Sequence, residues 1–389
     1  MKKSLIALAL MGAFSGAAVA QSNVTLYGIL DVNVQRNDPE NGSATTGING
    51  GHQSGNRWGV RGSEALGGGM SAIFTLEGGF NIDTGTLGQS STTSLPAAAG
   101  NRIFGRQAWA GLSFMNNSLS LVGGRIASFS SGTGSFDMFG QVDPFATGFG
   151  DSSLGSTFTP SSALRVDNTV ALVGGPWAGF RFGAGYSFNA IGAENAGSGN
   201  NNQATMLGAS WGGGPFFVSV TYDIIDVDQR GFTVAGQPFV AGGAGDMKFL
   251  QIGGTFDLKF LKIHAAYAKE DNVYLAPGSS GSPEFNTLDP GADADAWMLG
   301  VTVPLFGGQI LASYQDRDGD PISTRLGTAT APVITRERDV TVWAVGYTYP
   351  LSRRTNVYAT YSDRDLDGAG SAGTANDRKQ ATIGIRHLF

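Results

Sequence analysis

Histidine and cysteine, the residue types that most often carry nucleophilic and metal chemistry, are scarce in this chain. It contains no cysteine, which excludes disulfides and thiolate metal sites. A hydrolytic site needs a histidine with a nucleophile or a carboxylate in reach. His52 falls in a polar loop, His387 lies near the chain end, and His264 sits in a strand-like run, where histidine is more often structural. We therefore expect no catalytic residue, no metal and no cofactor.

Arginine, by contrast, recurs on the polar side of strand-like segments. Alternate residues of a strand point to opposite faces. Five arginines take the face opposite neighbouring apolar residues: Arg57 and Arg61 (opposite Trp58 and Val60), Arg102 and Arg106 (opposite Ile103 and Trp109), and Arg165 (opposite Val166 and Val170). Arg125 has the parity of Leu119 and Leu121, and a β-bulge at Gly123–Gly124 would reverse its facing. These arginines would give one face a positive charge that attracts anions.

A second group of charges lies on the longest connection between strand-like runs, residues 128–163. It carries Asp137, Asp143 and Asp151, together with the apolar side chains of "SFDMFGQVDPF". Long structureless loops are usually functional or disordered, and this one is too apolar to be left in water. We expect it to pack against an inner wall, where its aspartates would face the arginines across an aperture. The alternative is an external lid or a contact between subunits.

The elements that must position these charges are short runs of period two. Sixteen such runs begin near residues 24, 57, 70, 102, 119, 165, 180, 203, 216, 247, 260, 294, 308, 338, 355 and 380. Their connections alternate without exception between long and short, starting with a long polar loop at about 35–56 and a short turn at 63–69. A soluble sandwich has no reason to sort its loops in this way.

This rhythm predicts an all-β fold, a 16-stranded antiparallel transmembrane β-barrel with an inward-folded third loop, because such barrels have short turns on one side and longer loops on the other. Sixteen strands leave an aqueous channel. No stretch of the mature chain has the 18 or so consecutive apolar residues of a membrane helix, and 60 glycines would weaken helices. A secreted β-sandwich or solenoid is the alternative.

The N-terminus predicts export. Lys2 and Lys3 precede an apolar stretch and the small residues Ala18-Val19-Ala20, the pattern of a signal peptide over residues 1–20. The barrel domain would then comprise residues 21–389. Removing the two lysines leaves 25 − 2 = 23 basic against 31 acidic residues, a net charge of 23 − 31 = −8, which argues against nucleic acid as a partner.

Five segments resemble the general porins of β-proteobacterial outer membranes: "NRWGVRGSEALGGGMSAIFTLEGGF" (56–80), "NRIFGRQAWAGLSF" (101–114), "RVDNTV" (165–170), "PLSRRTNVYATYS" (350–362) and "IGIRHLF" (383–389). The resemblance spans essentially the whole mature chain. It implies a sixteen-stranded barrel in the outer membrane that assembles as a homotrimer and passes small hydrophilic solutes, often favouring anions. It also implies that the third loop narrows the barrel and that Arg57, Arg106 and Arg165 form a basic cluster at the narrowest point.

The same resemblance implies contact with outer-membrane lipid, lipopolysaccharide and the barrel assembly machinery. The terminal Phe389 would mark the last strand for assembly and lie in an aromatic girdle at the periplasmic edge. In a closed barrel this last strand pairs with the first, which explains why the chain ends inside an apparent strand.

Within this interpretation the local charges should decide ion preference. The acids of the long loops lie several Debye lengths of about 8 Å from mid-barrel, so we expect modest anion preference despite the net charge. A substrate-specific channel, for sugars or organic acids, is the alternative. A sugar channel would need aromatics along its lumen, whereas Trp297 and Trp343 have the outward parity. An outer-membrane barrel enzyme is a more distant alternative.

Overall fold

The fold is described from a computed structural model of the chain. The described residues are 23–40, 42–88, 102–146, 148–162, 164–190, 192, 194, 201–226, 233–234, 237–238, 246–273, 292–320, 322–325, 333–336, 339–366 and 377–389. The predicted signal peptide, 1–20, lies outside the described residues. No helix in the described part is long and apolar enough to cross a membrane.

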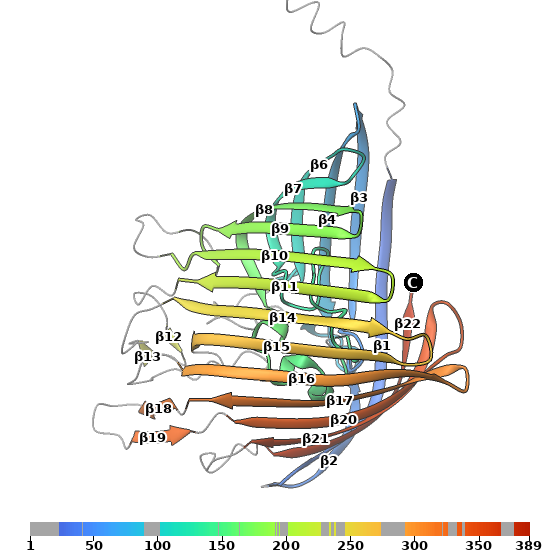
Figure 1. The fold of residues 1–389 in the computed structure, drawn as a ribbon, viewed down its shortest axis with the longest axis vertical. Helices are drawn as coiled ribbons and strands as arrows, with labels where there is room; N and C mark the ends of the chain where they lie inside the picture. The colour runs from blue at the N-terminus through green and yellow to red at the C-terminus, as the bar shows by residue number, and fades with distance from the viewer. Residues whose placement is uncertain are drawn as a thin grey trace, which may run out of the picture.

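Sixteen antiparallel strands form the wall of a closed barrel (Figure 1). They are β1 (Asn23–Pro39), β3 (Arg57–Gly67), β4 (Met70–Phe80), β6 (Gln107–Phe114), β7 (Leu119–Ala127), β8 (Arg165–Trp177), β9 (Phe180–Ser187), β10 (Ala204–Gly213), β11 (Phe216–Ile225), β14 (Met247–Asp257), β15 (Lys262–Val273), β16 (Ala292–Leu305), β17 (Gly308–Gly319), β20 (Val340–Pro350), β21 (Thr355–Leu366) and β22 (Arg378–Leu388). Each pairs with its neighbour in sequence, and β22 closes the ring onto β1.

The remaining strands are short. β2 (Thr45–Gly50) pairs with the outer half of β1, and β5 (Leu87–Gly88) pairs with the end of β4. β12 (Thr233–Val234) pairs with β13 (Gln237–Pro238), and β18 (Ile322–Arg325) pairs with β19 (Val333–Arg336), as small hairpins apart from the wall. The predicted loop at about 35–56 is therefore partly strand, because β1 continues to Pro39 and folds back as β2.

Fifteen of the sixteen predicted runs begin within two residues of an observed wall strand, which confirms the sixteen-stranded fold. The exception is the run expected from residue 102. Its strand, β6, begins only at Gln107, and residues 102–106 are irregular. Alternation therefore does not carry through from Arg106 to Trp109, and the expectation that Trp109 opposes the arginines was wrong. Its ring is buried against Phe136, with ring centroids 4.9 Å apart.

The two faces of the wall differ as lipid and water require. On β15 the outward residues Ile263 and Tyr267 are exposed, whereas His264 and Ala266, which alternate with them, are buried. Large exposed apolar side chains recur with this parity around the barrel, for example Trp211 on β10, Val218 on β11 and Trp343 on β20. A wall that exposes its apolar side chains is stable only with lipid outside it.

The chain end closes the barrel through backbone pairing. Phe389 donates from its N to Gly28 O at 3.1 Å, and Gly28 N donates to Phe389 O at 3.1 Å. A Cβ added at Gly28 would lie 2.3 Å from Cζ of the Phe389 ring, so the ring rests directly on this glycine. The Phe389 ring therefore occupies the space that a side chain at position 28 would need.

This contact gives a testable expectation. Gly28→Val should displace the Phe389 ring and weaken the joint between β1 and β22, so the yield of folded protein recovered from the outer membrane should fall severalfold. Heat-modifiable migration on gels measures the folded fraction. Gly47→Val on β2 is the matched control, because nothing lies within 4 Å of a Cβ at that position. Equal yields for the two variants would contradict the expected role of Gly28.

Candidate functional site

The polar face of the wall holds its charges in two ion-pair networks. In the first, Glu77 on β4 accepts a hydrogen bond from Arg106 Nε at 2.7 Å and another from Tyr27 OH at 2.9 Å. The side chains of Glu77 and Arg106 are each 4% exposed. Arg106 Nη2 also donates to Thr133 Oγ1, at 3.2 Å, on the long connection. A buried pair of this kind is fixed in geometry, because separating it would leave an uncompensated charge.

Arg57 lies beside this network on β3. Its Nε donates to Gly55 O at 2.9 Å, and its two terminal nitrogens make no hydrogen bond with the described part of the chain. Arg61 lies four residues further along β3, on the same face, and is exposed, with its guanidinium carbon 5.1 Å from the centroid of the Tyr27 ring. Among the described residues neither arginine forms an ion pair with a carboxylate, so both present positive charge on the polar face.

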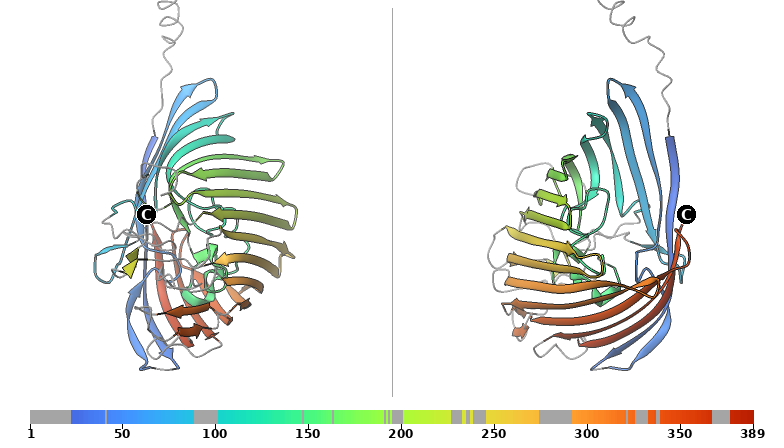
Figure 2. Two further views of the ribbon diagram at one scale, coloured as in Figure 1. Left: turned by 90° about the vertical axis from the view of Figure 1, so that its left-hand side faces the viewer. Right: turned by 45° about the vertical axis from the view of Figure 1, so that its right-hand side comes forward.

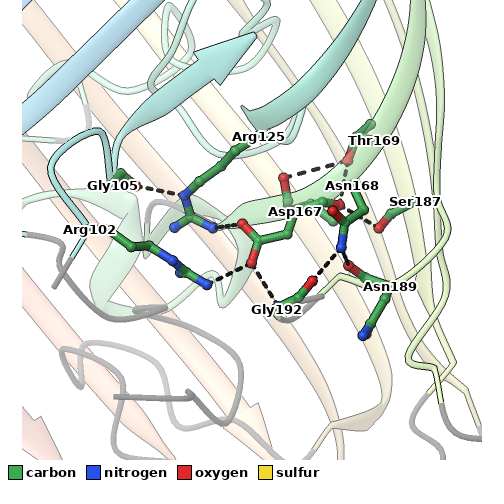
Figure 3. Close-up of polar contacts among 10 residues, drawn as sticks. Arg102, Gly105, Arg125, Asp167, Asn168, Thr169, Ser187, Asn189 and Gly192 are labelled. Carbon is green, nitrogen blue, oxygen red and sulfur yellow. Dashed lines mark hydrogen bonds and ion pairs between the residues drawn. The ribbon is translucent and has the colours of Figure 1, made fainter. Parts of the chain in front are cut away.

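The second network centres on Asp167 of β8 (Figure 3). Its carboxylate accepts from Arg102 Nη2 at 2.7 Å and from Arg125 Nη1, and it also accepts from Gly192 N at 2.8 Å. Arg125 Nε donates to Gly105 O at 2.8 Å. One carboxylate thus holds two guanidinium groups that come from different elements of the chain.

Arg125 reaches Asp167 because the pairing of β7 with β8 is irregular. Gly124 pairs with Thr169 and Ile126 pairs with Val166, so β8 has one more residue than β7 across this interval. Gly124 has φ +139°, and a Cβ there would lie 2.2 Å from Ala108 O. Arg125 is buried on the inner side as expected, but the extra residue lies on β8 opposite Arg125 rather than at Gly123–Gly124 of β7. Gly124 is required by both conformation and space.

Arg165, at the start of β8, connects the two networks. It is buried, and its charge interacts with those of Arg106, Arg125 and Glu77. Taken together, five arginines (Arg57, Arg102, Arg106, Arg125 and Arg165) lie with two carboxylates (Glu77 and Asp167). We call these seven residues the arginine cluster; its formal charge is +5 − 2 = +3.

The long connection between β7 and β8 contacts wall strands that are distant from β7 and β8 in the sheet order, namely β11, β15 and β17 (Figure 2). It contains three short 3₁₀ helices, η1 (Gly150–Ser152), η2 (Leu154–Ser156) and η3 (Pro160–Ser162). Its anchors include Ser130 Oγ to Asp223 on β11, Thr159 Oγ1 to Glu270 on β15 at 2.7 Å, and Thr157 Oγ1 to Gln315 on β17 at 2.8 Å. Phe129, Phe139, Phe145 and Phe158 are fully buried, which accounts for the apolar character of the segment.

The three aspartates of this connection bind within it or to another strand. Asp137 accepts from Phe139 N and Gly140 N, and Asp143 accepts from Phe145 N and Leu154 N, at 2.8–3.1 Å. Asp151 forms a two-point ion pair with Arg378 of β22. In the described part of the chain no ion pair joins Asp137 or Asp151 to the arginine cluster. Burial raises the pKa of Asp137 to about 6, so this carboxylate begins to lose its charge in mildly acidic medium.

Sequence reasoning did not identify the two carboxylates that hold the arginines. These carboxylates, Glu77 and Asp167, are absent from the predicted site. The signal that could have found Glu77 is a lone acid at mid-strand on a face otherwise carrying arginine and threonine. Its partner follows only from register, because Glu77 pairs with Gln107, the residue after Arg106.

Comparison with known proteins agrees with this architecture. The family model described as Gram-negative porin matches residues 6–369. The chain belongs to the Gram-negative porin family. An outer membrane porin protein of Bordetella pertussis is 31% identical over 431 residues, with all of both chains covered, and outer membrane porin protein 32 of Delftia acidovorans is 28% identical over the full length of both. An anion-selective porin from Comamonas acidovorans has a similar fold, with a TM-score of 0.69, 21% identity, and coverage of 95% of this chain and 100% of that one.

Family membership places this porin in the outer membrane, as a channel rather than an enzyme. The contacts of His264 on β15 are those of a structural residue: Nδ1 lies 2.9 Å from Val142 O, and Nε2 lies 3.1 Å from Thr302 Oγ1. Two of the most exposed large apolar side chains, Phe260 and Phe306, lie in the short turns between β14 and β15 and between β16 and β17.

Proposed function

We propose that this porin is a passive diffusion channel for small hydrophilic solutes whose arginine cluster makes it modestly anion-selective. The observation that carries the proposal is the charge balance of the cluster, five arginines against two carboxylates. Rings of charged side chains set the selectivity of pores. Residues 128–162 act as the constriction in this proposal, since they bind the wall at β11, β15, β17 and β22 and bring Thr133 to Arg106.

The roles within the cluster differ. Arg102, Arg106 and Arg125 are held in ion pairs, so they shape the positive field without presenting a free guanidinium. The terminal nitrogens of Arg57 and Arg61 make no hydrogen bond with the described residues, so they can meet a passing anion. Asp137, Asp143 and Asp151 serve this function by holding the connection in its conformation. The fold also supports a homotrimer, because OmpT, an outer membrane protein of Vibrio cholerae that is 16% identical with a TM-score of 0.56, is described in a trimer form.

An alternative role as a sugar-specific channel receives no support from the aromatic side chains. Trp109 and Phe136 of the inner face are buried against each other. Among the described residues, the exposed tryptophans Trp177, Trp211, Trp297 and Trp343 lie on outward-facing positions. Single-channel conductance with added sugars would test this alternative, since a specific site gives saturable block.

The decisive measurement is the reversal potential across a bilayer that separates two salt concentrations. We expect the wild-type porin to prefer anions and Arg106→Ala to lower the anion-to-cation permeability ratio about two- to fivefold, since a unit charge near 4 Å contributes about 1 kcal/mol in water. Arg353→Ala is the control, because Arg353 lies exposed in the turn between β20 and β21. Clear cation preference in the wild type would disprove the proposal.

A further inference from the structure

A second segment turns into the barrel between β2 and β3. In this segment His52 is buried, with Nε2 2.8 Å from Thr360 Oγ1, and the amide of Gln53 accepts from Asn356 Nδ2 at 2.8 Å. The tip of the long connection docks onto it, since Phe149 N donates to His52 O. The segment therefore lies between the inner wall and residues 148–149, close to the start of β3, where Arg57 lies.

The amide of Asn56 fixes where this segment leaves the wall. Asn56 Oδ1 accepts from Asp31 N at 2.6 Å, and Asn56 Nδ2 donates to Asp31 O at 3.0 Å. One side chain thus pairs with both backbone groups of Asp31, at the gap that β1 leaves between its pairing with β2 and its pairing with β3. A site satisfied in this way is rigid, because releasing it would leave buried backbone groups unpaired.

Ser54, held by this arrangement, stands between a carboxylate and a guanidinium. Ser54 N donates to Asp31 Oδ2 at 2.7 Å, and Arg386 Nη1 of β22 donates to Ser54 Oγ at 3.0 Å. Asp31 and Arg386 are direct partners in the strand register. No ion pair joins them in the described part of the chain.

The remaining contacts keep the two charges apart. Asp31 is fully buried, and its second oxygen accepts from Tyr358 OH at 2.6 Å. Arg386 Nε donates to Asn356 Oδ1 at 3.1 Å, and Arg386 Nη2 makes no hydrogen bond with the described residues. The carboxylate is therefore fully buried, while the half-buried guanidinium keeps one terminal nitrogen without a hydrogen-bond partner among the described residues.

The same segment also fixes Arg57, through Arg57 Nε and Gly55 O at 2.9 Å. Arg57 and Arg386 lie on the two strands that flank β1, and their charges repel each other. A planar guanidinium with free N–H groups suits the oxygens of carboxylates and phosphates. Two such groups, held by Ser54 and Gly55 of one rigid segment, form a place where a passing oxyanion exchanges water for protein donors.

We infer that Arg386 is a further anion-contacting residue of the channel and that Ser54 is a positioning residue that prevents its neutralisation by Asp31. This inference rests on the proposed function. It adds Arg386 of β22 to the positively charged residues beside Arg57. It also assigns the oxyanions of small carboxylates and of inorganic phosphate as the ligands that Arg57 and Arg386 contact.

The test compares reversal potentials in gradients of KCl and of potassium phosphate. Arg386→Gln should lower the anion-to-cation permeability ratio about two- to fivefold at low salt, as expected for loss of one unit charge near the path. Arg353→Gln, which removes the same charge at an exposed turn, should leave the ratio unchanged. Phosphate should reduce chloride current through the wild type and do so less through Arg386→Gln.

The role of Ser54 is tested by the anion-to-cation permeability ratio, which a purely structural role of Ser54 would leave unchanged. Ser54→Gly keeps every charge but lets Arg386 reach Asp31, so the permeability ratio should fall as far as in Arg386→Gln. Ser54→Thr retains the hydroxyl and should retain the ratio. Adding Asp31→Asn to Ser54→Gly should restore it, because the competing carboxylate is then neutral.

An unchanged ratio in folded Arg386→Gln, with Arg106→Ala still reducing it, would overturn the inference and leave the proposed function intact. If neither variant changed the ratio, the proposed function itself would fail. A loss in Ser54→Gly that Asp31→Asn does not restore would overturn the role of Ser54. Arg386→Gln alone decides the main point if the Ser54 variants do not fold.

Discussion

Glu270→Ala is expected to lower the free energy of unfolding by about 3–5 kcal/mol, the usual cost of breaking a buried ion pair by removing one partner. Glu270 on β15 accepts from Arg317 Nη1 of β17 at 2.9 Å, and their side chains are 1% and 0% exposed. The same carboxylate accepts from the N and Oγ1 of Thr159 at 2.8 and 2.7 Å. One substitution therefore breaks a contact between two wall strands and an anchor of the long connection.

The measurement is the urea midpoint of the detergent-solubilised porin, together with current noise in single-channel recordings. Loss of the anchor should raise open-channel noise, because η2 and η3 are no longer held to the wall. Glu64→Ala is the matched control, since Glu64 is an exposed glutamate on the outward face of β3. Equal stability and noise in the two variants would show that the Glu270 network does not hold the connection.

Glu77→Gln is expected to raise anion preference. Gln has nearly the same shape and can still accept from Tyr27 OH, but it leaves Arg106 without its counter-charge. The formal charge of the arginine cluster rises from +3 to +4. The anion-to-cation permeability ratio should therefore increase by about two- to fivefold at low ionic strength, as for one unit charge at close range.

Reversal potentials measured at several salt concentrations check this result, because screening should reduce the effect as ionic strength rises. Glu64→Gln changes the net charge of the porin equally but on the outward face, so its ratio should stay at the wild-type value. A fall in anion preference in Glu77→Gln would mean that Glu77 serves mainly to keep Arg106 in place. Arg106→Lys then separates position from charge, since lysine keeps the charge but not the fork of donors.

The two predictions concern different properties of one lumen. Glu270 binds the long connection to the wall, and Glu77 belongs to the arginine cluster to which we assign ion selectivity. Each is a carboxylate buried among arginine and hydroxyl donors, yet the first should act on stability and noise and the second on selectivity. Arg386 and Ser54 form a third arrangement, in which we infer that Ser54 prevents an ion pair between the Asp31 carboxylate and Arg386.

The architecture could be predicted because its determinants are local in sequence. Period-two alternation and the order of long and short connections located fifteen strand starts within two residues. The sixteenth failed because the irregular residues 102–106 look like part of a strand in composition. The facing of Arg57 and Arg61 likewise followed from single strands, whereas Arg125 needed a bulge, which lies on β8 rather than at the predicted glycines of β7.

The sequence by itself determined the barrel, the polar inner face and the positions of its arginines, because side-chain alternation depends only on neighbouring residues. Only the tertiary structure decided which charges meet. Glu77 meets Arg106, Asp167 meets Arg102 and Arg125, and Ser54 separates Asp31 from Arg386. These contacts depend on the stagger between strands, on one bulge and on where two segments turn inward, and each of these is set by pairing across the closed sheet rather than along the chain.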